Sequence, residues 1–167
     1  MAPGTESLAF LPYLAGERTP HNDPEATGAF VGLTLRHDRG ALVRAVLEGV
    51  AFAMRDALDL VGSGALGRVS GGGARSDLWL RIVASVLEVP LERTATDEGA
   101  AFGAAVLGGV AAGVWEAVAA AVRPTGTPVE PVTEWVQPYR EAIDRFRTLY
   151  PALHLAAREP DNEEQLA

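Results

Sequence analysis

The chain has 167 residues, of which 48% are hydrophobic and 22% charged, with a net charge of -8. This composition is that of a globular protein with room for one compact lobe, and it excludes wholesale disorder. An acidic chain without a cluster of lysine and arginine repels a phosphate backbone, so nucleic acid is not expected as a partner. The chain has no cysteine, which excludes disulfides, thiolate metal sites and a cysteine nucleophile. Because residues 1–6 lack the basic and apolar regions of a signal peptide, a cytoplasmic location is expected.

Two short apolar segments flank a polar loop near the N-terminus. Residues 7–14 are apolar enough to be buried, but Pro12 restricts them to an edge strand or an extended segment. Residues 28–34 form the second apolar segment. The loop at 16–24 is rich in turn-forming residues. Four of its polar side chains are candidates for a functional site: Glu17, Arg18, His21 and Asp23. Two interpretations stay open, a set of internal ion pairs and Asx turns or a functional site, and no residue of the loop is nominated as catalytic.

A long amphipathic helix is predicted over 41–61, with Asp38 as its N-cap. Apolar residues recur along it at helical spacing: Leu42, Val46, Val50, Met54, Leu58 and Val61. Another face collects charged residues: Arg44, Glu48, Arg55 and Asp59. The glycines of residues 62–67 end the helix.

The segment from Arg68 to Ser85 joins a short apolar approach, three glycines and a helix. Glycines 71–73 allow a sharp turn and close approach of a ligand, since they have no Cβ. Ser76 is predicted as the N-cap of the following helix. Its buried face is expected to hold Leu78, Trp79, Ile82, Val83 and Val86. A strand, a glycine turn and a helix N-terminus form a place where α/β proteins hold nucleotides, although a bare tight turn is the alternative.

Pro90 ends that helix, and residues 91–95 read as a strand that returns by a right-handed parallel crossover. Residues 96–98 are expected to cap an uncharged helix over 99–115. Its length and two spaced pairs of small residues, Gly99 with Gly103 and Gly109 with Gly113, raise the question of a membrane helix. We reject that interpretation because only one stripe is strongly apolar, formed by Phe102, Val106, Val110 and Val114, and the other face is mostly alanine and glycine.

The last third of the chain begins with a proline-rich connection over 123–138. A C-terminal helix over 139–150 follows, which Pro151 should end. Its apolar stripe consists of Tyr139, Ile143, Phe146 and Tyr150. Residues 159–167 are an acidic tail. The three histidines, His21, His37 and His154, lack the spacing of metal ligands, so no metal site is expected.

Three separated stretches together resemble one family. They are residues 11–20 (LPYLAGERTP), residues 28–33 running into 42–52 (GAFVGL, then LVRAVLEGVAF), and residues 70–79 (SGGGARSDLW) with 103–105 downstream. In this order they resemble the C-terminal lobe of FGGY carbohydrate kinases, with xylulokinases as the most similar subgroup, over roughly residues 8–150. Ala41 departs from the pattern, because the family usually carries a polar residue there.

The resemblance implies an α/β fold, a partial ribonuclease-H-like lobe of the actin/hexokinase type with helices packed on a few-stranded sheet, over residues 1–158. It also implies that the glycine turn lies against the adenosine of ATP. The cofactor-binding residues would be Gly71, Gly72, Gly73, Ala74 and Ser76, with the helix start at 99–103 close by. ATP and Mg²⁺ would be the cofactors, with the metal ligands outside this chain.

Family members are about three times as long, and their first lobe supplies the sugar pocket and the catalytic carboxylate. The isolated chain is therefore expected to be inactive and to meet a sugar, a ketopentose, only with that lobe. A sheet without its other strands should expose an edge and favour self-association. Two alternatives remain: a free-standing nucleotide-binding or partner-docking lobe, and a Rossmann oxidoreductase with Glu92 as the ribose-binding acid.

Overall fold

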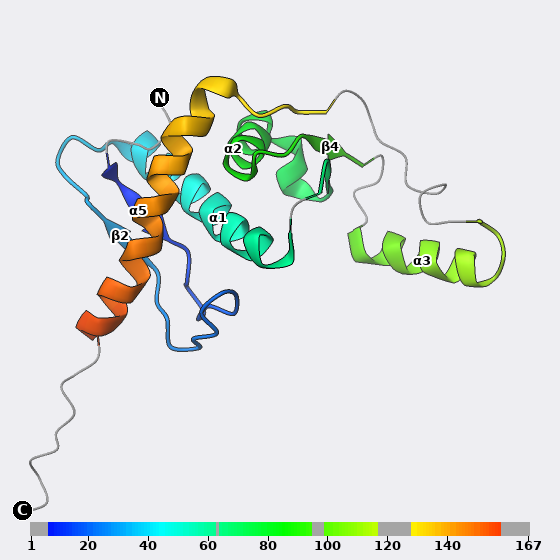
Figure 1. Ribbon diagram of the computed structural model, residues 1–167, viewed down its shortest axis with the longest axis horizontal. Helices are drawn as coiled ribbons and strands as arrows, with labels where there is room; N and C mark the ends of the chain where they lie inside the picture. Colours follow the sequence, from blue (N-terminus) through cyan, green and yellow to red (C-terminus); the bar gives the residue numbers. More distant parts are fainter. Residues whose placement is uncertain (1–6, 63, 95–98, 117–127, 158–167) are drawn as a thin grey trace, which may run out of the picture. The chain divides into compact units, whose positions relative to one another are not determined.

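The computed structural model describes residues 7–62, 64–94, 99–116 and 128–157 of the chain (Figure 1). It divides into two compact units. The first comprises residues 1–60 and 137–167, and the second comprises residues 61–136.

The first unit contains the antiparallel strands β1 (Ala9–Leu11) and β2 (Ala29–Val31). Phe10 and Phe30 are opposite each other in the register, with ring centroids 4.6 Å apart. Each strand coincides with one of the apolar segments predicted from the sequence. β1 ends directly before Pro12, as a residue without a backbone N–H requires.

Helix α1 (Arg39–Val61) begins where the sequence predicts, because the Oδ1 of Asp38 accepts a hydrogen bond of 2.8 Å from the N–H of Ala41. The apolar stripe predicted on α1 is buried only in part, since Leu42 and Val46 pack against buried core residues. Met54 and Val61 of the apolar stripe are 41% and 82% exposed. The buried residues are instead small, polar or aromatic: Ala41, Arg44, Ala45, Glu48, Gly49, Ala51, Phe52 and Asp56.

Strand β1 approaches α1 closely at one glycine of the helix. A Cβ on Gly49 would lie 2.0 Å from the carbonyl oxygen of Phe10, so the backbone of β1 rests directly on the helix at this glycine. Such an approach requires a residue without a Cβ at position 49.

Helix α5 (Thr133–Ala157) buries Tyr139, Ile143 and Phe146 as predicted. Both predicted ends are wrong, since Pro138 and Pro151 lie inside the helix. A proline within a helix removes one hydrogen bond and costs about 3 kcal/mol, so contacts on both sides must hold it. Tyr150 and His154, one before and one after Pro151, both contact the carboxylate of Asp23.

The second unit is built on the parallel strands β3 (Gly67–Val69) and β4 (Leu91–Arg93). Helix α2 (Asp77–Leu87) connects them, which confirms the predicted parallel pairing of these strands. The buried face of α2 includes Leu80, whereas Leu78 is 46% exposed, contrary to prediction. The other buried residues are Ile82, Val83, Ala84, Ser85 and Val86.

Helix α3 (Gly99–Ala111) ends earlier than predicted. Gly113 has a φ of +74°, and the N–H groups of Gly113 and Val114 donate to the carbonyls of Val110 and Gly109. These two bonds form a Schellman motif, which ends a helix at a left-handed residue. The ring of Trp115 then lies against Gly109, where a Cβ would come within 2.2 Å of it.

Three further segments were predicted from the sequence: a helix cap, an acidic tail and a proline-rich connection. The expected cap at 96–98 and the acidic tail at 159–167 lie outside the described residues. So does part of the proline-rich connection. Beyond it, Val129 forms an antiparallel bridge with Leu91. Within the described ranges, no helix combines the length and the apolar character needed to cross a membrane.

Candidate functional site

The glycine bend, residues 71–76, directly follows β3 and precedes α2. Gly71 has φ +84° and ψ -177°, a conformation that a side chain would strain. A 3-10 turn (Gly72–Arg75) follows, in which the N–H of Ala74 donates to the carbonyl of Gly71 over 3.1 Å. The sequence predicted the bend but not this turn.

One side of the bend is open. Among the described residues, no heavy atom outside the immediate chain neighbours lies within 4 Å of the place where a Cβ on Gly71 or Gly72 would stand. At Gly73 a Cβ would lie 3.2 Å from the indole Nε1 of Trp79. The backbone of Gly71 and Gly72 is therefore accessible to a flat group, with the Trp79 ring against the next glycine.

The N-terminus of α2 already has a negative charge and a cap. The Oγ of Ser76 accepts a hydrogen bond of 3.2 Å from the N–H of Trp79, which confirms the predicted N-cap. Asp77 lies in the first turn, where a carboxylate interacts favourably with the helix dipole. Asp77 thus already supplies the negative charge that a helix N-terminus favours, and Arg93 pairs with it.

Strand β4 holds the bend at its two ends. The N–H of Thr94 donates to the carbonyl of Val69 over 3.1 Å, at the entrance to the bend. The Nε of Arg93 donates to the carbonyl of Ala74 over 2.8 Å, and its guanidinium also pairs with the Asp77 carboxylate. Arg93 was not among the site residues predicted from the sequence. Its place at the carboxyl end of a strand next to the glycine strand is the signal that could have found it.

The polar loop of the first unit is held by its own hydrogen bonds. The Glu17 carboxylate accepts from the N–H groups of Thr19 and His21, at 2.6 and 2.7 Å. The Oδ1 of Asp23 accepts from the N–H of Glu25 over 2.9 Å, which is an Asx turn. The structure therefore favours the turn-forming interpretation of this loop.

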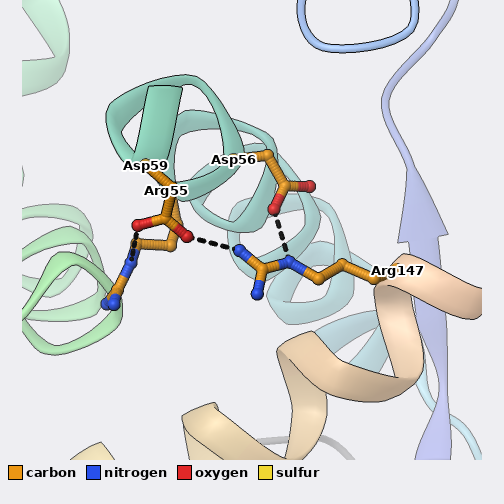
Figure 2. A network of polar contacts seen from close by, with 4 residues as sticks. All are labelled: Arg55, Asp56, Asp59 and Arg147. Atoms are coloured by element: carbon orange, nitrogen blue, oxygen red, sulfur yellow. Dashed lines mark hydrogen bonds and ion pairs between the residues drawn. The ribbon is translucent and has the colours of Figure 1, made fainter. Parts of the chain in front are cut away.

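A network of four charged residues links α1 to α5 (Figure 2). Arg147 donates to Asp56 and Asp59 over 2.7 and 2.6 Å, and Arg55 donates to Asp59 over 2.8 Å. Burial pushes the pKa of Asp59 upward, but the hydrogen bonds from Arg55 and Arg147 outweigh it and hold this pKa below its usual value. Because Asp59 favours its ionised form and is paired with two arginines, we assign this network a structural role.

A buried triad joins the same two helices. Arg44 donates to the Glu48 carboxylate over 2.6 Å and to the Tyr139 hydroxyl over 2.5 Å. The Tyr139 hydroxyl donates in turn to Glu48 over 3.0 Å. Burial, together with the Glu48 charge, raises the pKa of Tyr139. Two of the charged residues that were predicted on the polar face of this helix, Arg44 and Glu48, are therefore buried in the core.

The histidines of the described chain make structural contacts. The His21 ring stacks on Tyr150 with centroids 3.8 Å apart, and the His37 Nδ1 accepts from the N–H of Thr34 over 2.9 Å. Within the described ranges, no three histidine, aspartate or glutamate side chains are grouped so that they could hold a metal ion.

Comparison with known proteins identifies the family. The model of the C-terminal domain of the FGGY family of carbohydrate kinases matches residues 2–112. The chain is 48% identical over 112 residues to xylulose kinase of Escherichia coli (strain K12). This alignment covers 64% of this chain and 23% of that protein. It is 33% identical over 168 residues to gluconokinase of Bacillus licheniformis, covering 96% of this chain and 31% of that protein.

Solved structures agree with the sequence comparison. The crystal structure of a ligand-bound xylulose kinase from Lactobacillus acidophilus matches with a TM-score of 0.82 and 28% identity, over 92% of this chain and 33% of that one. Xylulose kinase from Rhodospirillum rubrum matches with a TM-score of 0.76 and 37% identity, over 93% of this chain and 32% of that one.

The fold is thus the α/β lobe of the actin/hexokinase type that the resemblance implied. The chain belongs to the FGGY family of carbohydrate kinases and corresponds to its C-terminal domain. It spans about a third or less of the length of these relatives. The family assignment replaces the Rossmann alternative.

Proposed function

We propose that this chain is the part of an ATP-dependent sugar kinase that contributes the adenosine side of the ATP site. The whole enzyme transfers a phosphoryl group from ATP to a hydroxyl group of a ketopentose such as xylulose. The identities of 48% over 112 residues and 47% over 106 residues with two xylulose kinases support the ketopentose.

The observation that carries the proposal is the open backbone at Gly71 and Gly72. In open α/β sheets, ligands bind beyond the carboxyl ends of the parallel strands, and the bend leaves the carboxyl end of β3. The free space over both glycines would admit the flat face of an adenosine. Five residues form the proposed site: Gly71, Gly72, Gly73, Ala74 and Ser76.

The charge of the bend agrees with adenosine rather than phosphate as its ligand. Asp77 already occupies the positive end of the α2 dipole, and Arg93 pairs with it. Mg²⁺ neutralises phosphate charge in phosphoryl transfer, and we assign none of its ligands to this chain. We also assign no catalytic residue here, so the isolated chain should bind nucleotide without transferring phosphate.

The variant Gly72→Leu tests the proposal. Its side chain enters open space and should leave the melting temperature nearly unchanged, but it would fill the place of the adenosine. We expect wild-type chain to bind ADP on the order of millimolar and Gly72→Leu to bind at least about tenfold more weakly. Isothermal titration calorimetry measures both.

Gly108→Leu is the matched control, since Gly108 of α3 is equally open among the described residues. It should bind ADP like the wild type. Equal ADP affinity of Gly72→Leu and wild type would contradict the proposed site.

A further inference from the structure

Few interactions within the glycine bend itself stabilise its conformation. Gly71 and Gly72 have no side chains, and glycine loses more conformational freedom on ordering than any other residue. The bend's own backbone hydrogen bonds, from Ala74 to Gly71 and from Ser76 to Gly73, are both 3.1 Å long. Preordering of such a loop in its bound shape strengthens binding, since the ordering cost no longer falls on the ligand.

Arg93 supplies a fixed point outside the bend. It belongs to β4, whose register sets it opposite Val69, the last residue of β3. Its Nε holds the carbonyl of Ala74, a residue that is only 8% exposed. The same guanidinium pairs with Asp77. A planar guanidinium can donate in both directions at once, so one side chain fixes the exit of the bend and the start of α2.

We propose that Arg93 is a positioning residue for nucleotide binding. It keeps the bend from Gly71 to Ala74 in the open conformation that admits adenosine, and it acts through the Ala74 carbonyl without touching the nucleotide. Thr94 holds the other end through Val69. The inference rests on the proposed function of the bend.

The experiment compares Arg93→Ala with Arg68→Ala. Arg68 is a matched control: it lies in β3 of the same sheet and pairs with Glu92 at 3.5 Å, but the structure gives it no contact with the described bend. Two readouts are used for each variant: ADP affinity by calorimetry, and hydrogen exchange of the Ala74 and Ser76 amides by NMR.

We expect Arg93→Ala to exchange these two amides about tenfold faster and to bind ADP about tenfold more weakly than the wild type, with Arg68→Ala unchanged in both. Arg93→Lys keeps the charge beside Asp77 without the planar fork, so it should recover only part of the affinity. A merely structural Arg93 would lower the melting temperature and leave ADP affinity intact.

The outcomes separate this inference from the proposed function. If the wild type binds ADP and Arg93→Ala or Arg93→Lys binds it equally well, the positioning role is overturned. If the wild type does not bind ADP, the proposed function fails, and the positioning role for nucleotide fails with it. Unchanged exchange of the Ala74 amide in Arg93→Ala would overturn the mechanical part of the inference in either case.

Discussion

At the scale of single residues, Asp23 shows how one carboxylate holds a loop against a helix. Its Oδ2 accepts from the Tyr150 hydroxyl over 2.6 Å and lies 3.1 Å from the His154 Nδ1, while its Oδ1 forms the Asx turn. The hydrogen bond from Tyr150 is the main reason why the pKa of Asp23 lies below its usual value. A lowered pKa means that the folded state favours the ionised carboxylate.

The variant Asp23→Asn should therefore be less stable than the wild type at neutral pH, and the difference should shrink in acid. The stabilisation by ionised Asp23 is fully present above the ordinary carboxyl pKa of about 3.9. It is lost as the pH falls through the lower pKa of the folded state. Thermal unfolding of both proteins between pH 7 and pH 3 measures this.

Asp144→Asn serves as the control, since Asp144 is exposed on α5. Its stability difference from the wild type should be small at every pH. A gap between Asp23→Asn and wild type that stays constant from pH 7 to pH 3 would be inconsistent with a role for the Asp23 charge.

At the scale of the elements, the packing of β1 on α1 depends on Gly49. Because its Cβ would lie 2.0 Å from the Phe10 carbonyl oxygen, an alanine can enter only if the strand moves away from the helix. We expect Gly49→Ala to destabilise the protein by about 1–3 kcal/mol, the usual cost of overpacking. Urea unfolding gives the value.

Gly108→Ala is the contrasting substitution in α3. Apart from its chain neighbours and the nearby backbone of α3, no heavy atom of the described chain lies within 4 Å of its added Cβ. Helix propensity alone should therefore decide, and the free energy of unfolding should rise by up to about 1 kcal/mol. If both substitutions changed the free energy of unfolding equally, the close approach at Gly49 would not contribute to stability.

Local signals in the sequence predicted the beginnings of elements well. Asp38 and Ser76 cap their helices as expected, because an N-cap bond joins residues three positions apart. The parallel pairing of β3 with β4 also followed from the strand, helix and strand pattern. The glycine bend was found for the same reason, since its three glycines are adjacent in the chain.

Features that depend on distant residues could not be predicted in this way. The close packing of α1 at Gly49 is set by the backbone of Phe10, about forty positions earlier, and the contact of Arg93 with Ala74 spans 19 positions. The end of α3 was missed because Gly113 was interpreted as part of a pair of small residues, whereas its left-handed conformation ends the helix.

At the scale of the whole molecule, the sheet of the second unit has two strands within the residues that the structure describes. Val129 pairs with Leu91 of β4, and within the described ranges no strand pairs with the other edge of β3. Two-stranded sheets have little stability of their own, and a free edge can accept another strand. Residues of α1 such as Met54 and Val61 also leave apolar surface exposed.

We therefore expect the chain to self-associate when it is studied alone. Multi-angle light scattering over a hundredfold range of concentration, roughly the range that resolves micromolar affinities, should give a molar mass that rises above that of one chain. A mass of one chain at every concentration would contradict this expectation.

The central claim is that the glycine bend of this FGGY-family chain accepts adenosine. A titration of ¹⁵N-labelled wild-type chain with ADP, followed amide by amide, tests it most directly. We expect saturable shifts at the amides of Gly71, Gly72, Gly73 and Ala74, with the loop at 16–24 unaffected. Shifts confined to other parts of the chain, or none at the bend at high ADP concentration, would contradict it.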